Sequence, residues 1–313
     1  MGRWVCSGLG RFCIAELPGT VVMSAPPRPI AISVVVPCHN AAAFVGTQLD
    51  ALARQHCDAG WEVVVVDNGS TDATRQVAER YRERLPQLVI VEALERRGAA
   101  YARNTGARAA QGENVAFCDA DDEVDVGWLP AVAAALREHR AIAFRTDTAK
   151  LNPGTDGRTI NQSDGLQPYT YPPYLPYSGS TIALRRDLYL KLGGFDESLL
   201  ACEDADLCWR LQHAGVPLVF VRDALVHVRL RTSLGAMCRQ ARLWGEYNVV
   251  LYKKYRPLGM PVLPRLQGLR NLVGTLRRFP RLGRRNTRSE WLWEANWMVG
   301  RLRGSVKHRV WAL

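Results

Sequence analysis

Two carboxylate side chains stand close together just beyond an expected strand. Asp119, Ala120 and Asp121 follow the apolar run NVAFC, so the two acids lie two positions apart at a tight turn. Hard oxygen ligands of this kind suit Mg²⁺ or Mn²⁺ together with the oxygens of a diphosphate. A solvated acidic turn has the same sequence, so the pair alone does not decide between the two interpretations.

A second acidic cluster, Glu203, Asp204 and Asp206, opens an expected helix over residues 204–213. The helix dipole favours carboxylates at this end, so helix capping explains the cluster as well as chemistry does. The chemical alternative is a carboxylate base that removes the proton of a hydroxyl group.

Polar residues also follow a second apolar run, WEVVVV. Asp67 can accept hydrogen bonds from a base or a ribose, and Gly69 permits close approach of the backbone. An ordinary strand-to-helix turn uses the same residue types. His227 lies in another apolar run, ALVHV, where a lone histidine is more often a core residue than a metal ligand.

Apolar, β-branched runs alternate with helical patterns four times in the first 140 residues. Strands are expected over residues 30–37, 61–66, 88–91 and 114–118, and helices over 41–54, 72–84, 98–111 and 128–140. The alternation predicts an α/β fold with a parallel sheet and helices on both faces. Ligands of such sheets bind at the carboxyl ends of the strands, where the polar motifs lie.

The remaining chain divides by composition. Residues 151–178 are rich in Pro, Gly, Asn and Tyr and form a long loop, and residues 233–254 and 290–309 have amphipathic helical patterns. We expect a weakly structured leader over residues 1–28, one α/β domain over 29–230 and a helical, basic C-terminal region over 231–313.

Charge is distributed unevenly along the 313 residues, whose 47% hydrophobic and 23% charged content is ordinary for a globular protein. The net charge is +11, but the part from Arg229 onward holds 19 Lys and Arg and three Asp and Glu, which leaves the rest at −5. Such a basic region suggests contact with phospholipid, lipid-linked phosphate or nucleic acid. The alternative is that its apolar stripe packs on the preceding domain and its arginines are solvated.

Eight cysteines occur without a CxxC pair or zinc-finger spacing, so we expect a reduced, cytoplasmic protein without structural zinc. No stretch reaches the roughly 18–20 apolar residues that cross a bilayer, and the N-terminus makes a poor signal peptide. We therefore expect a cytoplasmic location, with peripheral contact at the inner face of the membrane through the basic region.

Five blocks, taken in order, resemble the family 2 glycosyltransferases of the GT-A fold: SVVVPCHN, VVVVDNGSTD, RRGAAYARNTGARAAQGENVAFCDADD, GGFDE and CEDADLCWRLQHAG. The resemblance covers about residues 30–230. It implies a Rossmann-like, mixed and mostly parallel sheet flanked by helices. It also implies an inverting transferase that uses a nucleotide-diphospho-sugar and a metal such as Mn²⁺ or Mg²⁺. A glycan or lipid-linked acceptor, as in cell-envelope or polysaccharide assembly, would suit the charge of the basic C-terminal region.

The resemblance also implies roles for individual residues. The residues expected to border the donor, its base or its ribose are Pro37, His39, Asn40, Asp67, Asn68, Arg103, Asn104, Asp119 and Ala120. Asp119 and Asp121 would form the metal motif, with His227 matching a histidine that completes the site in some relatives. Asp204 would be the catalytic base. Many relatives have two Asp where this chain has Asp67 and Asn68, so the choice among uracil, thymine and guanine stays open.

Two other functions share some of these features. A nucleotidyltransferase would need a Gly-rich, basic loop after the first strand to hold a triphosphate, and this chain has CHNA there. A nucleic-acid-binding protein would explain the basic region, but no recognisable nucleic-acid motif is present, so we expect no nucleic-acid partner.

Overall fold

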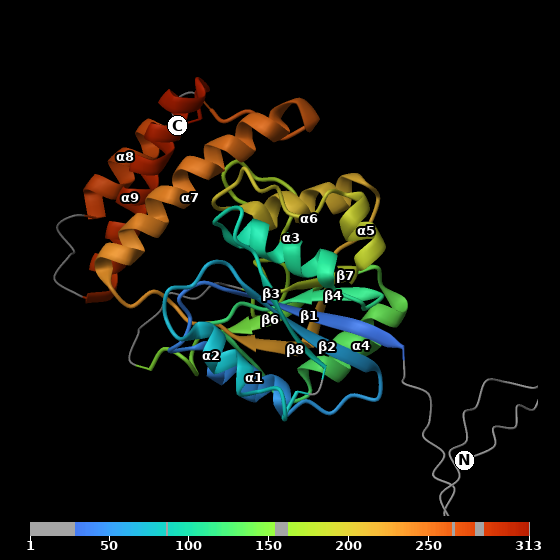
Figure 1. Ribbon diagram of the computed structural model, residues 1–313. Coiled ribbons are helices and arrows are strands. Elements are labelled where there is room, and N and C mark those ends of the chain that lie inside the picture. Colours follow the sequence, from blue (N-terminus) through green and yellow to red (C-terminus); the bar gives the residue numbers. More distant parts are fainter. Residues whose placement is uncertain (1–28, 86, 154–161, 265–266, 279–284, 313) are drawn as a thin grey trace, which may run out of the picture.

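The computed structural model describes residues 29–85, 87–153, 162–264, 267–278 and 285–312 (Figure 1). The leader expected over residues 1–28 lies outside these residues. The strands are β1 (Ile30–Cys38), β2 (Gly60–Asp67), β3 (Leu88–Glu92), β4 (Asn114–Phe117), β5 (Glu123–Val124), β6 (Ala141–Asp147), β7 (Ile182–Arg185) and β8 (Val219–His227). They form one sheet in the order β3-β2-β1-β4-β7-β6-β8-β5.

Helices cover both faces of this sheet. The α-helices are α1 (Val45–Ala53), α2 (Thr74–Glu79), α3 (Ala99–Ala109), α4 (Trp128–Glu138), α5 (Arg186–Lys191), α6 (Glu203–His213), α7 (Leu234–Tyr255), α8 (Gln267–Arg278) and α9 (Arg285–His308). In Figure 1, α1, α2 and α4 lie on one face, α3, α5 and α6 lie on the other, and α7 to α9 stand at one side.

The sheet is mixed and mostly parallel. Strands β1 to β4 are parallel neighbours, as the alternating pattern predicted. β7 runs antiparallel to both β4 and β6, and β5 runs antiparallel to β8. The α/β class and the mixed sheet are therefore confirmed. Strands β5, β6 and β7 were not predicted. β5 has two residues and β7 has four, which is too few for a periodic pattern. β6, with the sequence AIAFRTD, follows α4 without a turn signal.

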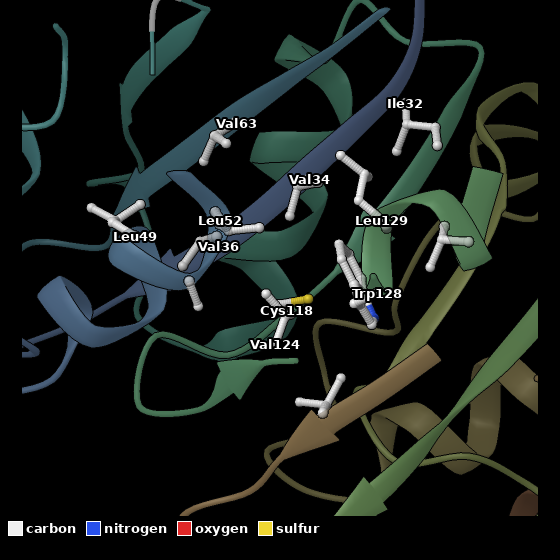
Figure 2. Packing of buried hydrophobic residues seen from close by; sticks show 14 of the residues in the cluster. Ile32, Val34, Val36, Leu49, Leu52, Val63, Cys118, Val124, Trp128 and Leu129 are labelled. Carbon is white, nitrogen blue, oxygen red and sulfur yellow. The ribbon is translucent and has the colours of Figure 1, made fainter. Parts of the chain in front are cut away.

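The central strand β1 is buried on both faces, as its β-branched run requires. Val34 and Val36 face α1 and α4, where Figure 2 shows them packed with the neighbouring apolar side chains. Val35 faces the opposite side, where α3 lies. A Cβ at Gly106 of α3 would lie 2.5 Å from Val35 Cγ1, so the absence of a side chain lets α3 sit close on the sheet.

The helix expected over residues 72–84 is shorter than predicted. α2 ends at Glu79, and the next residues form tighter turns in which Tyr81 N and Arg84 N donate to carbonyls three positions back. This tightening brings the Tyr81 hydroxyl to the Gly46 carbonyl at 2.9 Å, which ties the segment to α1.

In the basic C-terminal region, α7 and α9 run side by side in the same direction. Gly300 and Gly304 of α9 face the carbonyls of Arg242 and Glu246 on α7, and Gly245 of α7 faces α9 in return. The close approach of the two backbones needs glycine at these positions. The helices also pack on the rest of the protein, as one of the two expectations stated, and α7 begins only seven residues after β8 ends.

Among the described helices, none combines the length and the apolar character that crossing a bilayer requires.

The glycine contact between α7 and α9 gives a stability prediction. Gly300→Ala should lower the free energy of unfolding by about 1–3 kcal/mol, because the methyl group would overlap the Arg242 carbonyl. Gly274→Ala on α8, where a Cβ meets no atom within 4 Å, is the control and should raise stability by up to about 1 kcal/mol. Urea unfolding of both variants measures the difference, and a stabilising Gly300→Ala would contradict the close packing.

Candidate active site

The expected motifs meet at the carboxyl ends of the parallel strands. The β1 and β2 loops are joined where Asn68 N donates to the Cys38 carbonyl at 2.8 Å and the His39 ring nitrogen Nδ1 lies 3.1 Å from the Asn68 carbonyl. The loop after β4 carries Asp119, whose Oδ2 accepts a hydrogen bond from Ser180 Oγ at 2.8 Å. Ser180 stands just before β7, so the rim draws on segments far apart in the sequence.

Arg103 of α3 joins two acidic motifs. It is 3% exposed, and its Nη2 donates to Asp119 Oδ1 at 2.6 Å while its Nη1 donates to Glu203 Oε1 at 2.9 Å. Burial opposes the charge on this guanidinium, but the two carboxylates outweigh burial and raise its pKa. The cation thus places the turn after β4 beside the start of α6.

The three acids after β4 differ in their charge environment. Burial would raise the pKa of Asp119, but Arg103 and Ser180 outweigh it and hold that pKa below its ordinary value. Burial and the charge of Asp119 raise the pKa of Asp121, and burial with both neighbouring acids raises the pKa of Asp122 further. The charged forms of Asp121 and Asp122 are therefore disfavoured in this structure, and a cation bound at the turn would stabilise them.

The turn after β4 fits a metal ion that binds together with a phosphate-bearing substrate. No group of three or more His, Cys, Asp or Glu side chains within the described ranges is arranged to hold a metal. Asp119 and Asp121 would then supply carboxylate oxygens and leave the other coordination positions to phosphate oxygens and water. Mg²⁺ is usually bound in this way, through one or two carboxylates together with substrate phosphates.

His227 lies at the end of β8 between two other acids. Its Nδ1 is 3.0 Å from Asp147 Oδ2, and its Nε2 is 3.5 Å from Asp125 Oδ1. Both ring nitrogens therefore face carboxylates outside the metal motif that the sequence predicted. The metal role of His227 stays a prediction.

Asp204 stands in the first turn of α6, which Cys202 opens in the left-handed conformation with φ of 62°. Burial and the neighbouring charge of Glu203 raise the pKa of Asp204 to about 7. A Cβ on Gly179 would lie 3.8 Å from Asp204 Oδ2. The chain that leaves the long loop predicted over residues 151–178, called the Tyr-rich loop below, therefore passes beside this carboxylate. A carboxylate with such a pKa can accept a proton near neutral pH.

The third acid of this cluster, Asp206, is structural. Its side chain is fully buried and accepts from Arg210 Nε at 2.8 Å, Tyr255 Oη at 2.8 Å and Lys254 Nζ at 2.6 Å. Lys254 also contacts Asp196 Oδ2 at 2.8 Å. The spacing of the acids alone did not separate Asp206 from Asp204, which only the family resemblance singled out, because two partners of Asp206 come from α7, about fifty residues later.

Asn68 has a different environment from the one expected. It is 5% exposed, and its amide donates to the carbonyls of Ala93 and Arg96 at 2.5 and 2.7 Å while its Oδ1 accepts from Gly98 N at 2.9 Å. The amide thus faces the loop after β3 rather than open space beside Asp67. An aspartate could not donate to those two carbonyls, which explains why an amide suits this position.

Asn104 is likewise directed into the protein. Its Oδ1 accepts from Phe195 N at 2.9 Å and from the Tyr189 hydroxyl, and its Nδ2 donates to Glu197 Oε1 at 2.9 Å. It holds the turn GGFDE beneath α3, where Gly194 has a φ of 69°.

The remaining expected residues lie at or under the rim. Asp67 Oδ1 accepts from Ser70 N at 2.9 Å, and Asn40, with φ of 49°, accepts from Thr71 N at 2.8 Å. Ala120 is 5% exposed and belongs to the core beneath the turn. Pro37 lies in register with Val66 where β1 and β2 end.

Arg97 is a rim residue that the sequence analysis did not single out. Its Nη1 lies 2.9 Å from His39 Nε2, and its Nη2 would lie 3.8 Å from a Cβ on Gly69. A pocket of about 70 Å³ beside it is lined by Arg96, the first turn of α3 and Glu203. The doubled arginine before Gly98 in the block RRGAAYARN was the signal available in the sequence.

Comparison with known families and proteins extends these observations. A family model described as "Glycosyl transferase family 2" matches residues 33–193, just over half of the chain, and one described as "Glycosyl transferase family group 2" matches residues 157–300. The amylovoran biosynthesis glycosyltransferase AmsB of Erwinia amylovora is 28% identical over 67% of this chain and 73% of its own length.

Other relatives are matched over a smaller part of their length. The poly(ribitol-phosphate) β-N-acetylglucosaminyltransferase TarS of Staphylococcus aureus is 36% identical over 42% of this chain and 22% of its own length. The pre-mycofactocin glycosyltransferase of Mycobacterium tuberculosis is 30% identical over 65% of this chain and 43% of its own. The chain therefore spans less than half the length of these two relatives.

Solved structures share the fold. The mannosyltransferase PcManGT from Pyrobaculum calidifontis, in complex with GDP-Man and Mn²⁺, superposes with a TM-score of 0.61 at 21% identity and covers 89% of both chains. S. aureus TarS 1–349 in complex with UDP-GlcNAc superposes with a TM-score of 0.52 at 20% identity, over 91% of this chain and 93% of the other.

The Arg103 bridge gives a stability prediction independent of activity. Arg103→Met should lower the free energy of unfolding by about 3 kcal/mol, because it leaves Asp119 and Glu203 without their shared cation. Arg108→Met on the same helix is the control: its side chain is 53% exposed and 4.0 Å from its carboxylate partner, so we expect a loss below about 1 kcal/mol. Equal losses in urea unfolding would contradict the proposed importance of the bridge.

Proposed function

This chain belongs to glycosyl transferase family 2, and on that premise we propose that it transfers a sugar from a nucleotide-diphospho-sugar to an acceptor hydroxyl with inversion of the anomeric carbon. One observation carries the proposal: Arg103 lies within 2.9 Å of both Asp119 and Glu203, the residue before Asp204. A metal-binding turn and a carboxylate base need this kind of proximity. Because the chain belongs to this family, we do not pursue the two alternatives of a nucleotidyltransferase and a nucleic-acid-binding protein.

The donor nucleotide would bind where β1 and β2 end. Asp67 offers its carboxylate to the base or ribose, and His39 and Arg97 border the same rim. We assign Asn68 and Asn104 to holding the surrounding loops, because their amides face the protein. The two similar structures are complexes with GDP-Man and UDP-GlcNAc, so guanine and uracil are the bases to test first.

The metal would be held by Asp119 and Asp121. When bound, a divalent cation offsets the negative charge of the leaving diphosphate. We leave His227 outside this assignment, because Asp125 and Asp147 face its ring nitrogens. The Mn²⁺ in the PcManGT complex makes Mn²⁺ the first ion to test.

Asp204 would remove the proton of the acceptor hydroxyl while the oxygen of that hydroxyl attacks the anomeric carbon from the face opposite the diphosphate. Its raised pKa makes it an effective base near neutral pH. Burial and the negative charge of Glu203 keep that pKa high, and Glu203 also accepts a hydrogen bond from Arg103, so the two neighbouring acids have different roles.

The acceptor would be a glycan or a lipid-linked saccharide. AmsB is an amylovoran biosynthesis glycosyltransferase and TarS a poly(ribitol-phosphate) β-N-acetylglucosaminyltransferase, which supports a role in glycan assembly. The Tyr-rich loop packs on α6, with ring centroids of Tyr169 and Tyr174 4.7 and 5.0 Å from Trp209, so it can shape a site beside Asp204. We also propose peripheral contact with the membrane through the basic region.

Substitution of the base should separate chemistry from binding. Asp204→Asn should lower sugar transfer by at least about 10²-fold, because the amide cannot accept the proton. Calorimetric affinity for the nucleoside diphosphate with Mn²⁺ should stay unchanged. Asp187→Asn, at an exposed acid of α5, is the matched control. Substantial transfer by Asp204→Asn would remove this residue from the role.

Substitution at the metal motif should weaken the metal-dependent part of binding. Asp119→Ala and Asp121→Asn should each lower the affinity for the nucleoside diphosphate more than tenfold in Mn²⁺ and leave the affinity in EDTA unchanged. Asp121→Asn is the cleaner test, because its side chain takes no part in the Arg103 bridge. An unchanged affinity in Mn²⁺ would overturn the assignment.

The pH profile should report on Asp204. Because the base acts deprotonated, kcat/KM should fall below about pH 7, the pKa to which burial and Glu203 raise this group. Glu203→Gln removes the neighbouring negative charge, which lowers the pKa of Asp204 and moves the acidic limb to lower pH. A limb that does not move, or moves to higher pH, would contradict the assignment.

A further inference from the structure

The C-terminal half of α9 presents apolar side chains to solvent. Val299, Leu302 and Val306 are 42%, 52% and 73% exposed, and their spacing of three and four positions places them on one face of the helix. Trp311, just beyond the helix, is 63% exposed. We call these four residues the α9 face.

The α9 face cannot turn inward to hide its apolar surface. The opposite side of the helix is fixed by Gly300 and Gly304 against the backbone of α7. Between them, Arg301 is 2% exposed, with its guanidinium 4.2 Å from the centroid of the Tyr171 ring. Rotation of α9 would break these contacts, so the face stays exposed unless another molecule covers it.

Basic residues flank the α9 face. Arg303, Lys307 and Arg309 are exposed on and beside it. Acids are scarce nearby: the chain from residue 229 onward holds three, and one of them, Glu246, is paired with Lys307. The neighbouring helix α8 adds further exposed arginines.

We propose that the α9 face docks on an anionic lipid bilayer. An apolar stripe with a tryptophan at its end and basic residues at its edges matches an acyl boundary covered by anionic headgroups. Nucleic acid offers the charge but no apolar partner for Val299, Leu302 and Val306. A second copy of this chain offers the apolar partner but brings like charges together.

The C-terminal helices that carry the α9 face are joined directly to the proposed metal motif. Arg229, just before α7, donates from its backbone N–H to Asp122 Oδ1 at 3.0 Å, and Arg231 Nη1 lies 3.7 Å from Asp121 Oδ2. The segment that enters the C-terminal helices thus starts at the metal motif. The docking proposal narrows the membrane contact proposed above to four residues; the consequence for a lipid-linked acceptor also rests on the proposed sugar transfer, whereas binding to vesicles does not.

The test is co-sedimentation of the full chain with vesicles of phosphatidylcholine, with or without about one third phosphatidylglycerol. We expect binding to the anionic vesicles that falls when salt is raised from about 0.05 to about 0.5 M. The double variant Leu302→Ser, Val306→Ser and the single variant Arg303→Glu should each bind at least tenfold more weakly. Leu190→Ser and Arg137→Glu, exposed positions outside this region, are the matched controls and should bind like the wild type.

Several outcomes would overturn the docking proposal. These are no sedimentation at low salt, equal binding to neutral vesicles, wild-type binding by the double variant, or a dimer in solution that the double variant dissociates. Calorimetry of a nucleoside diphosphate with Mn²⁺ on the same preparations keeps the two proposals apart. A chain that binds vesicles but no nucleotide contradicts the proposed function and leaves docking intact.

Discussion

The charge balance around Arg103 is the constraint on which the rest of the site depends. Asp119 and Glu203 come from turns about eighty residues apart, and two partly buried carboxylates would repel each other without the cation between them. Arg103 reaches both because α3 sits close on β1 through Gly106. The packing of one helix on the sheet therefore sets the distance between the proposed metal motif and the proposed base.

The C-terminal helices belong to this arrangement rather than being an appendage to it. Asp206 of α6 is paired with Lys254 of α7 and accepts a hydrogen bond from the hydroxyl of Tyr255, and Lys254 also contacts Asp196 in the turn that Asn104 holds. α7 therefore fixes the helix that carries Asp204. Of the two expectations for the basic region, the structure shows packing of α7 on the protein, and the membrane contact stays a proposal.

Sequence reasoning could predict the parallel half of the fold, because β-branched runs such as VVVV and the polar turns after them are local signals. It could not predict β7, whose four residues pair through contacts distant in the chain. The motifs located the candidate site, but the roles within it depend on tertiary partners. The resemblance placed Asn68 beside the nucleotide, and spacing placed Asp206 in the acidic cluster that could supply a base. In the structure Asn68 donates to the carbonyls of Ala93 and Arg96, and Asp206 pairs with Arg210 of α6 and Lys254 of α7.

The most direct measurement of the central claim is a crystal structure of the chain with Mn²⁺ and a nucleoside-diphospho-sugar, with anomalous scattering to locate the metal. The account predicts Mn²⁺ at Asp119 and Asp121 beside the diphosphate, with the sugar's anomeric carbon on the side of Asp204. A nucleotide bound away from the ends of β1, β2 and β4, or a metal without either aspartate, would contradict it.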